Sequence, residues 1–281
     1  MIEGKVNYIC FATFLNDSTN QQLLEEIIIA ISSYFKAHRF IVKNKLWKWI
    51  LIPGIIYAIL FVIGIYFFWE STAFIIDFIF TKAGLKAWLE RENVRWLNFI
   101  FIFGQIILQL ILMLLYFSWF KYLFLIIGSP LFAYLSEKTE AILLNADYPF
   151  SLKRFLSDIL RGIHIAVRNL LWQTVYTVSI LILGLIPVLG WIAPLASLFI
   201  ECFYFGFSML DYTNERKGLS ATASIDFINR HKGLAIGNGM IFYCIHILPI
   251  IGWIFAPGYA VVAATLSMQE KQKNNFIYLN K

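Results

Sequence analysis

Two stretches of this sequence, residues 49–69 and 97–120, contain no charged residue. About 20 consecutive apolar residues, each adding about 1.5 Å of helix, are enough to cross the roughly 30 Å hydrocarbon core of a bilayer. Aromatic residues of the kind found at membrane interfaces lie at both ends of the first stretch: Trp47, Trp49, Tyr66 and Trp69. The sequence therefore predicts an all-α integral membrane protein with two full transmembrane helices.

The composition supports this prediction. Hydrophobic residues make up 60% of the chain and charged residues only 14%, whereas soluble proteins have about 25% charged residues. A net charge of +6 could indicate nucleic-acid binding in a soluble protein. Here the Lys and Arg residues flank apolar blocks, as charges at a membrane edge do. We therefore expect the lipid bilayer as the partner, no nucleic acid, and a multi-pass protein of the inner or plasma membrane.

Two further apolar stretches, residues 170–210 and 233–268, are each interrupted near the middle. Both interruptions follow the pattern Pro-x-x-Gly-Trp and end in Ala-Pro: Pro187, Gly190 and Pro194 in the first, Pro249, Gly252 and Pro257 in the second. Proline cannot donate a backbone hydrogen bond and glycine readily adopts turn conformations, so the chain should reverse there. Arms of about 16 residues would measure roughly 24 Å, less than the bilayer core. We predict two re-entrant helical hairpins, with pairs of short spanning helices as the alternative.

The remaining segments complete a single membrane domain, residues 1–281. In the N-terminal half we expect an amphipathic segment at 1–45, a first crossing at 46–69, and a connector at 70–95 with a surface helix near 75–86. The second crossing with its extension follows at 96–127, and then a polar segment at 128–169 with an amphipathic surface helix. The C-terminal half consists of hairpins at 170–210 and 233–268, a linker between them at 211–232, and a tail at 269–281. Gly128 and Pro130 are expected to end the second crossing helix, with Ser129 capping the next one. Gly218-Leu219-Ser220 predicts a turn and a helix cap in the linker.

The charge distribution predicts orientation only weakly. If both hairpins return to the face they entered from, the connector at 70–95 holds four of the 23 Lys and Arg residues and the other 19 lie on the opposite side. The positive-inside tendency then favours both termini in the cytoplasm. Four basic residues in this short connector are not a low density, however. Insertion in both orientations therefore stays open.

Several short motifs carry a family resemblance by their order and spacing. Gly-Ser-Pro-Leu-Phe at 128–132 precedes Leu-Ser-Glu-Lys-Thr-Glu at 135–140, and Leu-Asp-Tyr at 210–212 precedes Gly-Leu-Ser at 218–220 and His-Lys-Gly-Leu-Ala at 231–235. From about residue 46 to 268, this order resembles the CysZ-type sulfate permeases, a group that includes the eukaryotic etoposide-induced membrane proteins. The resemblance implies a homo-oligomeric permease or channel for sulfate or a similar small oxyanion, built from antiparallel dimers. The chain departs from the family's Leu-Arg-Arg before the first crossing, where it has Leu46, Trp47 and Lys48.

A dianion that enters a membrane protein needs backbone N–H groups and cations to replace its hydration. Lys45 and Lys48 lie at the mouth of the first crossing, with Arg39 preceding them, and Lys48 matches a basic position of the family. Ordinary contact with lipid headgroups is the alternative role for these cations. Gly237 and Asn238 begin the second hairpin, where they either line a polar path or allow close helix packing.

Glu201 lies inside the third apolar block, where an acidic residue costs on the order of 3 kcal/mol. We expect it to face a water-filled cavity or a partner, for example a basic residue across an oligomer, with a position near the membrane interface as the alternative. The sequence has no metal-ligand cluster, nucleotide-binding loop or nucleophile elbow. We therefore predict neither an enzyme nor a cofactor. A non-transporting assembly or structural protein of the same family is the alternative to a permease.

Overall fold

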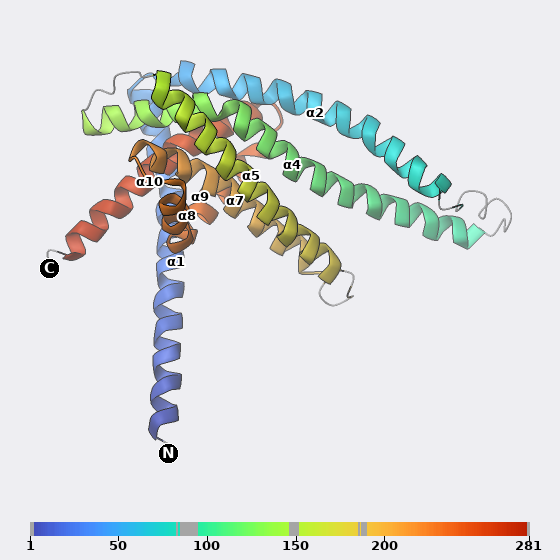
Figure 1. Cartoon of the computed structure of the whole chain (residues 1–281), viewed down its shortest axis with the longest axis horizontal. Helices are drawn as coiled ribbons and strands as arrows, with labels where there is room; N and C mark the ends of the chain where they lie inside the picture. The colour runs from blue at the N-terminus through green and yellow to red at the C-terminus, as the bar shows by residue number, and fades with distance from the viewer. Residues whose placement is uncertain are drawn as a thin grey trace.

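The computed structural model describes residues 3–82, 84, 95–145, 152–184, 186 and 190–279. The elements of this part of the chain are helices: α1 (Glu3–Lys43), α2 (Trp47–Lys82), α4 (Arg95–Leu144), α5 (Leu152–Leu183), α7 (Ala193–Arg216), α8 (Ala221–Arg230), α9 (Lys232–His246) and α10 (Ile251–Leu279). In Figure 1, α2 and α4 run side by side as one long arm, and α5 and α7 form a hairpin that diverges from it. Helices α1, α8, α9 and α10 gather where these two units meet.

Within the described residues, five helical segments are long and apolar enough to cross a membrane: Trp47–Lys82, Ile102–Leu144, Leu160–Leu183, Ala193–Arg216 and Ile251–Lys273. Helix α9 has 15 residues, roughly 22 Å at about 1.5 Å per residue. The predicted all-α membrane fold is confirmed. Three of the helices that contain the predicted arms are longer than those arms: α5, α7 and α10 have 32, 24 and 29 residues, because they continue into the predicted polar segment, linker and tail.

Helix α2 extends well beyond the predicted first crossing. It continues past Trp69 to Lys82 without a break, so residues 75–82 belong to the crossing helix instead of a separate surface helix. The physical reason is that Glu70 and Asp77 interrupt the apolar pattern but do not break a helix, because both are tolerated in helix interiors. The rest of the predicted connector, apart from residues 84 and 95, lies outside the described residues.

Helix α4 likewise continues through the predicted break at residues 128–130. Pro130 lies inside the helix, and Ser129 Oγ donates to the Ile126 carbonyl at 2.9 Å instead of capping a new helix. A proline inside a helix removes one backbone hydrogen bond, and in a membrane protein neighbouring helices can compensate for that loss. The prediction that Gly128 and Pro130 end this helix is therefore wrong.

The second chain reversal lies between α9 and α10, where Pro249 is in the turn and Ile250 has a positive φ of 65°. Gly252 follows in the first turn of α10, and its N–H donates to the Leu248 carbonyl at 2.8 Å. Pro257 is not part of the turn, because it lies inside α10. Helix α10 then continues through the predicted tail to Leu279.

The first reversal, between α5 and α7, is described only in part. Gly190 donates to the Ile186 carbonyl at 2.8 Å, and Pro194 is in the first turn of α7, a position where a missing N–H costs little. Pro187 lies outside the described residues. Helix α5 itself joins the predicted amphipathic surface helix to the first hairpin arm without interruption.

One local prediction for the linker is confirmed. Ser220 caps α8, because its side chain accepts a hydrogen bond from the Ala223 N–H at 3.2 Å.

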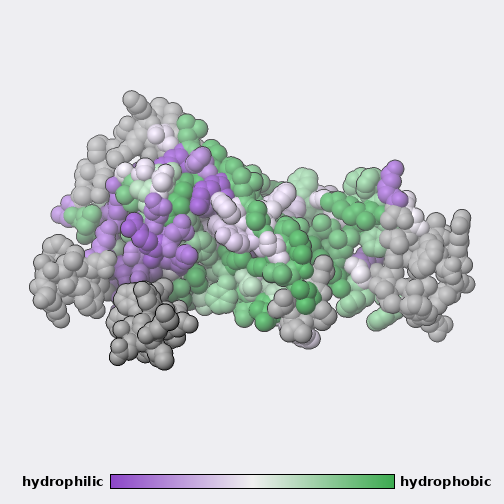
Figure 2. All heavy atoms as spheres, turned by 60° about the horizontal axis from the view of Figure 1, so that its bottom comes forward, coloured by the Kyte–Doolittle hydropathy of each residue, from purple (hydrophilic) through white to green (hydrophobic). Residues whose placement is uncertain are grey.

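Figure 2 shows how the elements divide the surface between polar and apolar regions: hydrophilic residues gather at the end away from the α2–α4 arm, and hydrophobic residues cover much of the view toward that arm. An apolar exterior of this kind suits contact with lipid.

Candidate functional site

The predicted basic mouth lies at the junction of α1 and α2. Arg39, Lys45 and Lys48 are all exposed. Lys45 has a positive φ of 55° in the turn that joins the two helices, and Lys48 lies in the first turn of α2. The first amides of a helix have no acceptor within it, so they and the helix dipole attract anions. In α2 the Trp49 amide already donates to the Leu46 carbonyl at 3.0 Å, so the arrangement offers an anion the amides of Trp47 and Lys48 beside the exposed cations.

Gly237 and Asn238 lie elsewhere, at the buried contact between α9 and α1. A Cβ at Gly237 would lie 2.8 Å from the Ala30 Cβ, closer than normal contact. Asn238 is fully buried, and its side-chain Nδ2 donates to the Ala260 carbonyl at 3.0 Å. The Asn238 backbone carbonyl accepts from the Tyr34 hydroxyl at 2.8 Å. These contacts favour the close-packing alternative over an exposed polar path.

Glu201 has a basic partner within its own chain. Its Oε2 lies 2.7 Å from Lys121 Nζ on α4 and accepts from the Tyr243 hydroxyl at 3.1 Å. Gln173 on α5 accepts from Lys121 at 2.7 Å and donates to Glu201 Oε1 at 2.5 Å. It also donates to the Ser118 hydroxyl. The carboxylate therefore links four helices, and the expectation of a partner across an oligomer is not needed to explain it.

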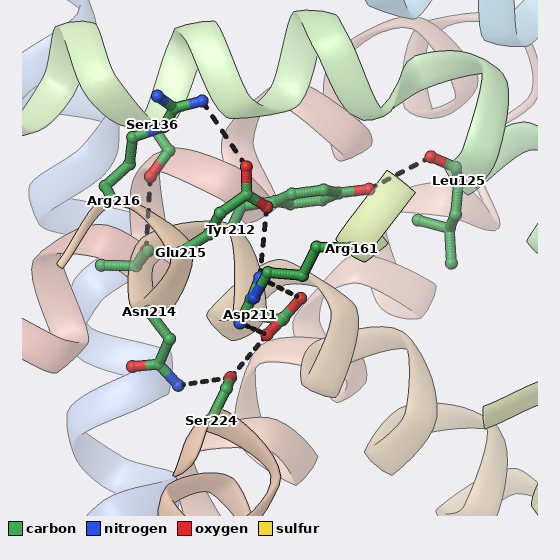
Figure 3. A network of polar contacts seen from close by, with 10 residues as sticks. Leu125, Ser136, Arg161, Asp211, Tyr212, Asn214, Glu215, Arg216 and Ser224 are labelled. Atoms are coloured by element: carbon green, nitrogen blue, oxygen red, sulfur yellow. Dashed lines mark hydrogen bonds and ion pairs between the residues drawn. The ribbon is translucent and has the colours of Figure 1, made fainter. Parts of the chain in front are cut away.

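A second group of buried charges centres on Arg161 of α5, shown in Figure 3. Arg161 Nη2 lies 2.9 Å from Asp211 Oδ1, and its Nη1 lies 3.3 Å from Glu215 Oε2. Ser224 of α8 donates to Asp211 at 2.5 Å and accepts from Asn214 at 3.0 Å. The charged side chains of α7 are thus held from two neighbouring helices, α5 and α8.

The same network brings together two motifs that are distant in sequence. Arg216 Nη1 lies 2.6 Å from Glu137 Oε2 on α4, and its Nη2 lies 3.7 Å from Glu215 Oε1. The hydroxyls of Ser136 and Thr213 are 3.4 Å apart. Residues 135–140 and the segment that begins at 210–212 are therefore in direct contact. Sequence analysis singled out both motifs but did not identify the arginines that join them.

The charge balance of this network indicates its role. Two arginines face three carboxylates: Arg161 and Arg216 against Glu137, Asp211 and Glu215. Within the described residues each of these arginines already contacts two carboxylates, so neither is placed as a lone cation for an anion. The network is better suited to fixing the relative positions of α4, α5 and α7, since removing one partner of a buried ion pair is strongly destabilising.

A smaller polar cluster joins α1 to the start of α9 and to α10. Glu26 is buried, and its Oε1 lies 2.6 Å from His231 Nδ1, 2.9 Å from Gln22 Nε2 and 3.5 Å from Lys271 Nζ. Burial raises the pKa of Glu26, but the hydrogen bonds from His231 and Gln22 and the nearby positive charges outweigh it, so that the pKa lies below its ordinary value. Within the described residues, no group of three or more His, Cys, Asp or Glu side chains is placed to hold a metal ion.

The apolar helices, with their buried ion pairs, define a multi-pass α-helical membrane protein. A family profile described as "Sulfate transporter CysZ/Etoposide-induced protein 2.4" matches residues 33–257. The chain belongs to this family, which confirms the resemblance seen in its motifs. One relative is the protein named sulfate transporter CysZ from Pseudomonas syringae pv. tomato, which is 26% identical over 175 residues, or 61% of this chain and 68% of that protein.

Proposed function

We propose that this protein is a permease or channel of the inner or plasma membrane that passes sulfate or a similar small oxyanion. The observation that carries the proposal is the family match over residues 33–257, which includes α2 and α4 and most of both hairpins. The relative that is named a sulfate transporter supports the choice of substrate. A purely structural role in the membrane has no comparable support.

The anion first meets the protein at the junction of α1 and α2 in this proposal. Arg39, Lys45 and Lys48 supply exposed positive charge there. The amides at the start of α2 supply uncharged donors, and together these groups replace part of the hydration that a dianion gives up. Lys48 is the first choice among them, because it is closest to the helix end and matches a basic position of the family.

The proposal is tested by uptake of radiolabelled sulfate into proteoliposomes. We expect Lys48→Ala to reduce uptake roughly fivefold, the equivalent of about 1 kcal/mol of lost interaction with the anion. Lys48→Arg keeps the charge and should retain most of the uptake. Lys82→Ala is the matched control, since it removes an exposed lysine at the other end of the same helix and should leave uptake unchanged.

The uptake measurements test sulfate transport and the role of Lys48 separately. Uptake by the folded wild-type protein that equals that of empty vesicles would reject sulfate transport itself, and other oxyanions would then be tested as substrates. Normal uptake by Lys48→Ala would return Lys48 to ordinary headgroup contact and leave the proposed function standing. Equal losses in Lys48→Ala and Lys82→Ala would indicate a general effect of surface charge.

We further propose that the two hairpins are re-entrant and that the chains assemble as antiparallel dimers. Re-entry is supported by the paired Pro/Gly interruptions in both hairpins and, in the second hairpin alone, by the short α9, whose roughly 22 Å is less than the bilayer core. Antiparallel assembly is what the resemblance to the CysZ-type permeases implies.

The test of re-entry uses a chain without its native cysteines and a membrane-impermeant maleimide. A cysteine at Ile251, the first residue of α10 next to the second turn, is compared with a cysteine at Lys273 further along the same helix. If the hairpin is re-entrant, reagent added on the side opposite to Lys273 should not label the cysteine at Ile251. Ready labelling from that opposite face would contradict re-entry.

A further inference from the structure

A cavity of about 510 Å³ lies between α2, α4, α7 and α9. Its volume is within the range of sites for drug-sized ligands, which are mostly apolar with a few polar groups. Aromatic rings from all four helices line it, among them Tyr57, Phe61, Phe117, Phe120, Phe205 and Phe242. The cavity is therefore large, apolar and rich in ring faces, which carry negative electrostatic potential.

The lining residues of the cavity come from the α2–α4 arm, from α7 of the α5–α7 hairpin and from α9, and the arm and the hairpin diverge in Figure 1. The most exposed lining residues include Met113 on α4 and Leu198 on α7, with 38% and 49% of their surface accessible. Both belong to helical segments that are long and apolar enough to cross a membrane. The exposed part of the cavity lining is therefore apolar at these two residues, as a route from the hydrocarbon region requires.

The ion pair of Lys121 and Glu201 lines this cavity. The lysine side chain is 8% exposed and is held by Glu201 and Gln173, whereas the glutamate side chain is 20% exposed. The carboxylate is therefore the more accessible charge of the pair. The other titratable lining groups are Tyr243, which donates to Glu201, and Tyr57 and His246, whose hydroxyl and Nε2 are 3.3 Å apart.

These features do not suit a small dianion. Sulfate would give up its hydration in an apolar cavity where the lysine that lines it is the less accessible charge of the ion pair, held by both Glu201 and Gln173. They do suit a bulky organic cation, because ring faces attract cations once these are desolvated and the accessible carboxylate adds an ionic contact. We propose that the cavity binds lipophilic organic cations that enter it sideways from the membrane. This proposal does not depend on sulfate transport.

The test compares two ions of nearly the same size and shape but opposite charge, tetraphenylphosphonium and tetraphenylborate. Their binding to the purified full-length protein in lipid nanodiscs is measured by calorimetry, with empty nanodiscs subtracted. We expect saturable binding of tetraphenylphosphonium, and tetraphenylborate at least tenfold weaker. Equal or tighter binding of tetraphenylborate, or no saturable binding of either ion, would overturn the proposal.

Two variants locate the site. Glu201→Gln should weaken tetraphenylphosphonium binding roughly tenfold, the size of one lost ionic contact. Leu198→Trp fills the mouth of the cavity without altering the ion pair and should also weaken binding, so the test survives if Glu201→Gln fails to fold. The matched control is Leu195→Trp, which changes an exposed leucine of the same helix that does not line the cavity and should bind normally. Unchanged binding in Leu198→Trp, or equal losses in Leu195→Trp and Leu198→Trp, would contradict this location.

Discussion

The inner bundle is formed by α1, α7, α9 and α10 with the parts of α2 and α4 that pack on them, such as Gly54, where a Cβ would lie 1.8 Å from the Ile254 carbonyl oxygen of α10. The outer arm is formed by residues 62–82 of α2 and 95–113 of α4. Both are apolar, but they are built differently.

In the inner bundle small residues let backbones touch, and residues 260–264 of α10 are fully buried. In the outer arm large side chains point outward: Phe74 and Phe99 are 70% and 71% exposed. The comparison shows that hydrophobicity alone does not distinguish a packed helix from one that faces lipid. The size of the residues and the placement of polar groups distinguish the two kinds of helix.

The buried charges also differ between regions. The network around Arg161 joins α4, α5 and α7 where polar residues are frequent, and its arginines and carboxylates contact one another repeatedly. The pair of Lys121 and Glu201 lines an apolar cavity, and its hydrogen-bond partners among the described residues are the Gln173 amide and the Tyr243 hydroxyl. The first arrangement fixes helices in place. The second leaves a charge accessible from the cavity, which is why the two sites are assigned different roles.

The largest expected effect comes from Arg161→Ala. The substitution leaves Asp211 and Glu215, both buried, without the arginine that lies between them. Removing one member of a buried ion pair costs about 3–5 kcal/mol. We therefore expect a large loss of thermal stability in detergent, measured by tryptophan fluorescence.

Lys82→Ala is the control for this substitution, because it removes an exposed cation from the outer arm. Exposed charges contribute about 0–1 kcal/mol, so its melting temperature should stay close to that of the wild type. Similar melting temperatures for Arg161→Ala and Lys82→Ala would show that the network contributes little to stability. The structural role given to it here would then be wrong.

The existence of the crossing helices could be predicted from the sequence, whereas their ends could not. The uncharged stretches at 49–69 and 97–120 are sufficient to identify α2 and α4. Pro130 looked like a helix end, but it lies inside α4. Whether a proline ends a helix depends on the neighbours that compensate for its missing hydrogen bond, and a single sequence does not show those neighbours.

The partners of the buried charged residues could not be predicted from the sequence either. Glu201 could be singled out because an acidic residue in an apolar stretch needs a partner. Its partner Lys121 is 80 residues away in the chain, and no local pattern connects the two. The motif at 135–140 and the segment after 210 were found separately. Only the fold shows that Arg216 joins them through Glu137.

Gly206 and Gly104 offer a sharper test of the two regions with a smaller expected effect. A Cβ at Gly206 of α7 would lie 1.9 Å from the Ala235 carbonyl oxygen of α9, whereas nothing lies within 4 Å of a Cβ at Gly104 in the outer arm. Gly206→Ala must push α7 and α9 apart, and overpacking of this kind costs about 1–3 kcal/mol. Gly104→Ala meets no obstacle, and alanine favours a helix over glycine by up to about 1 kcal/mol.

The same substitution should therefore affect the two sites differently: it should lower the melting temperature at Gly206 and leave it unchanged or slightly raise it at Gly104. Melting temperatures of the two variants, measured in the same detergent, compare the regions directly because the chemical change is identical. If Gly206→Ala were as stable as Gly104→Ala, α7 and α9 would not be in backbone contact. The inner bundle would then resemble the outer arm, and the distinction between a close-packed interior and a lipid-facing arm would fail.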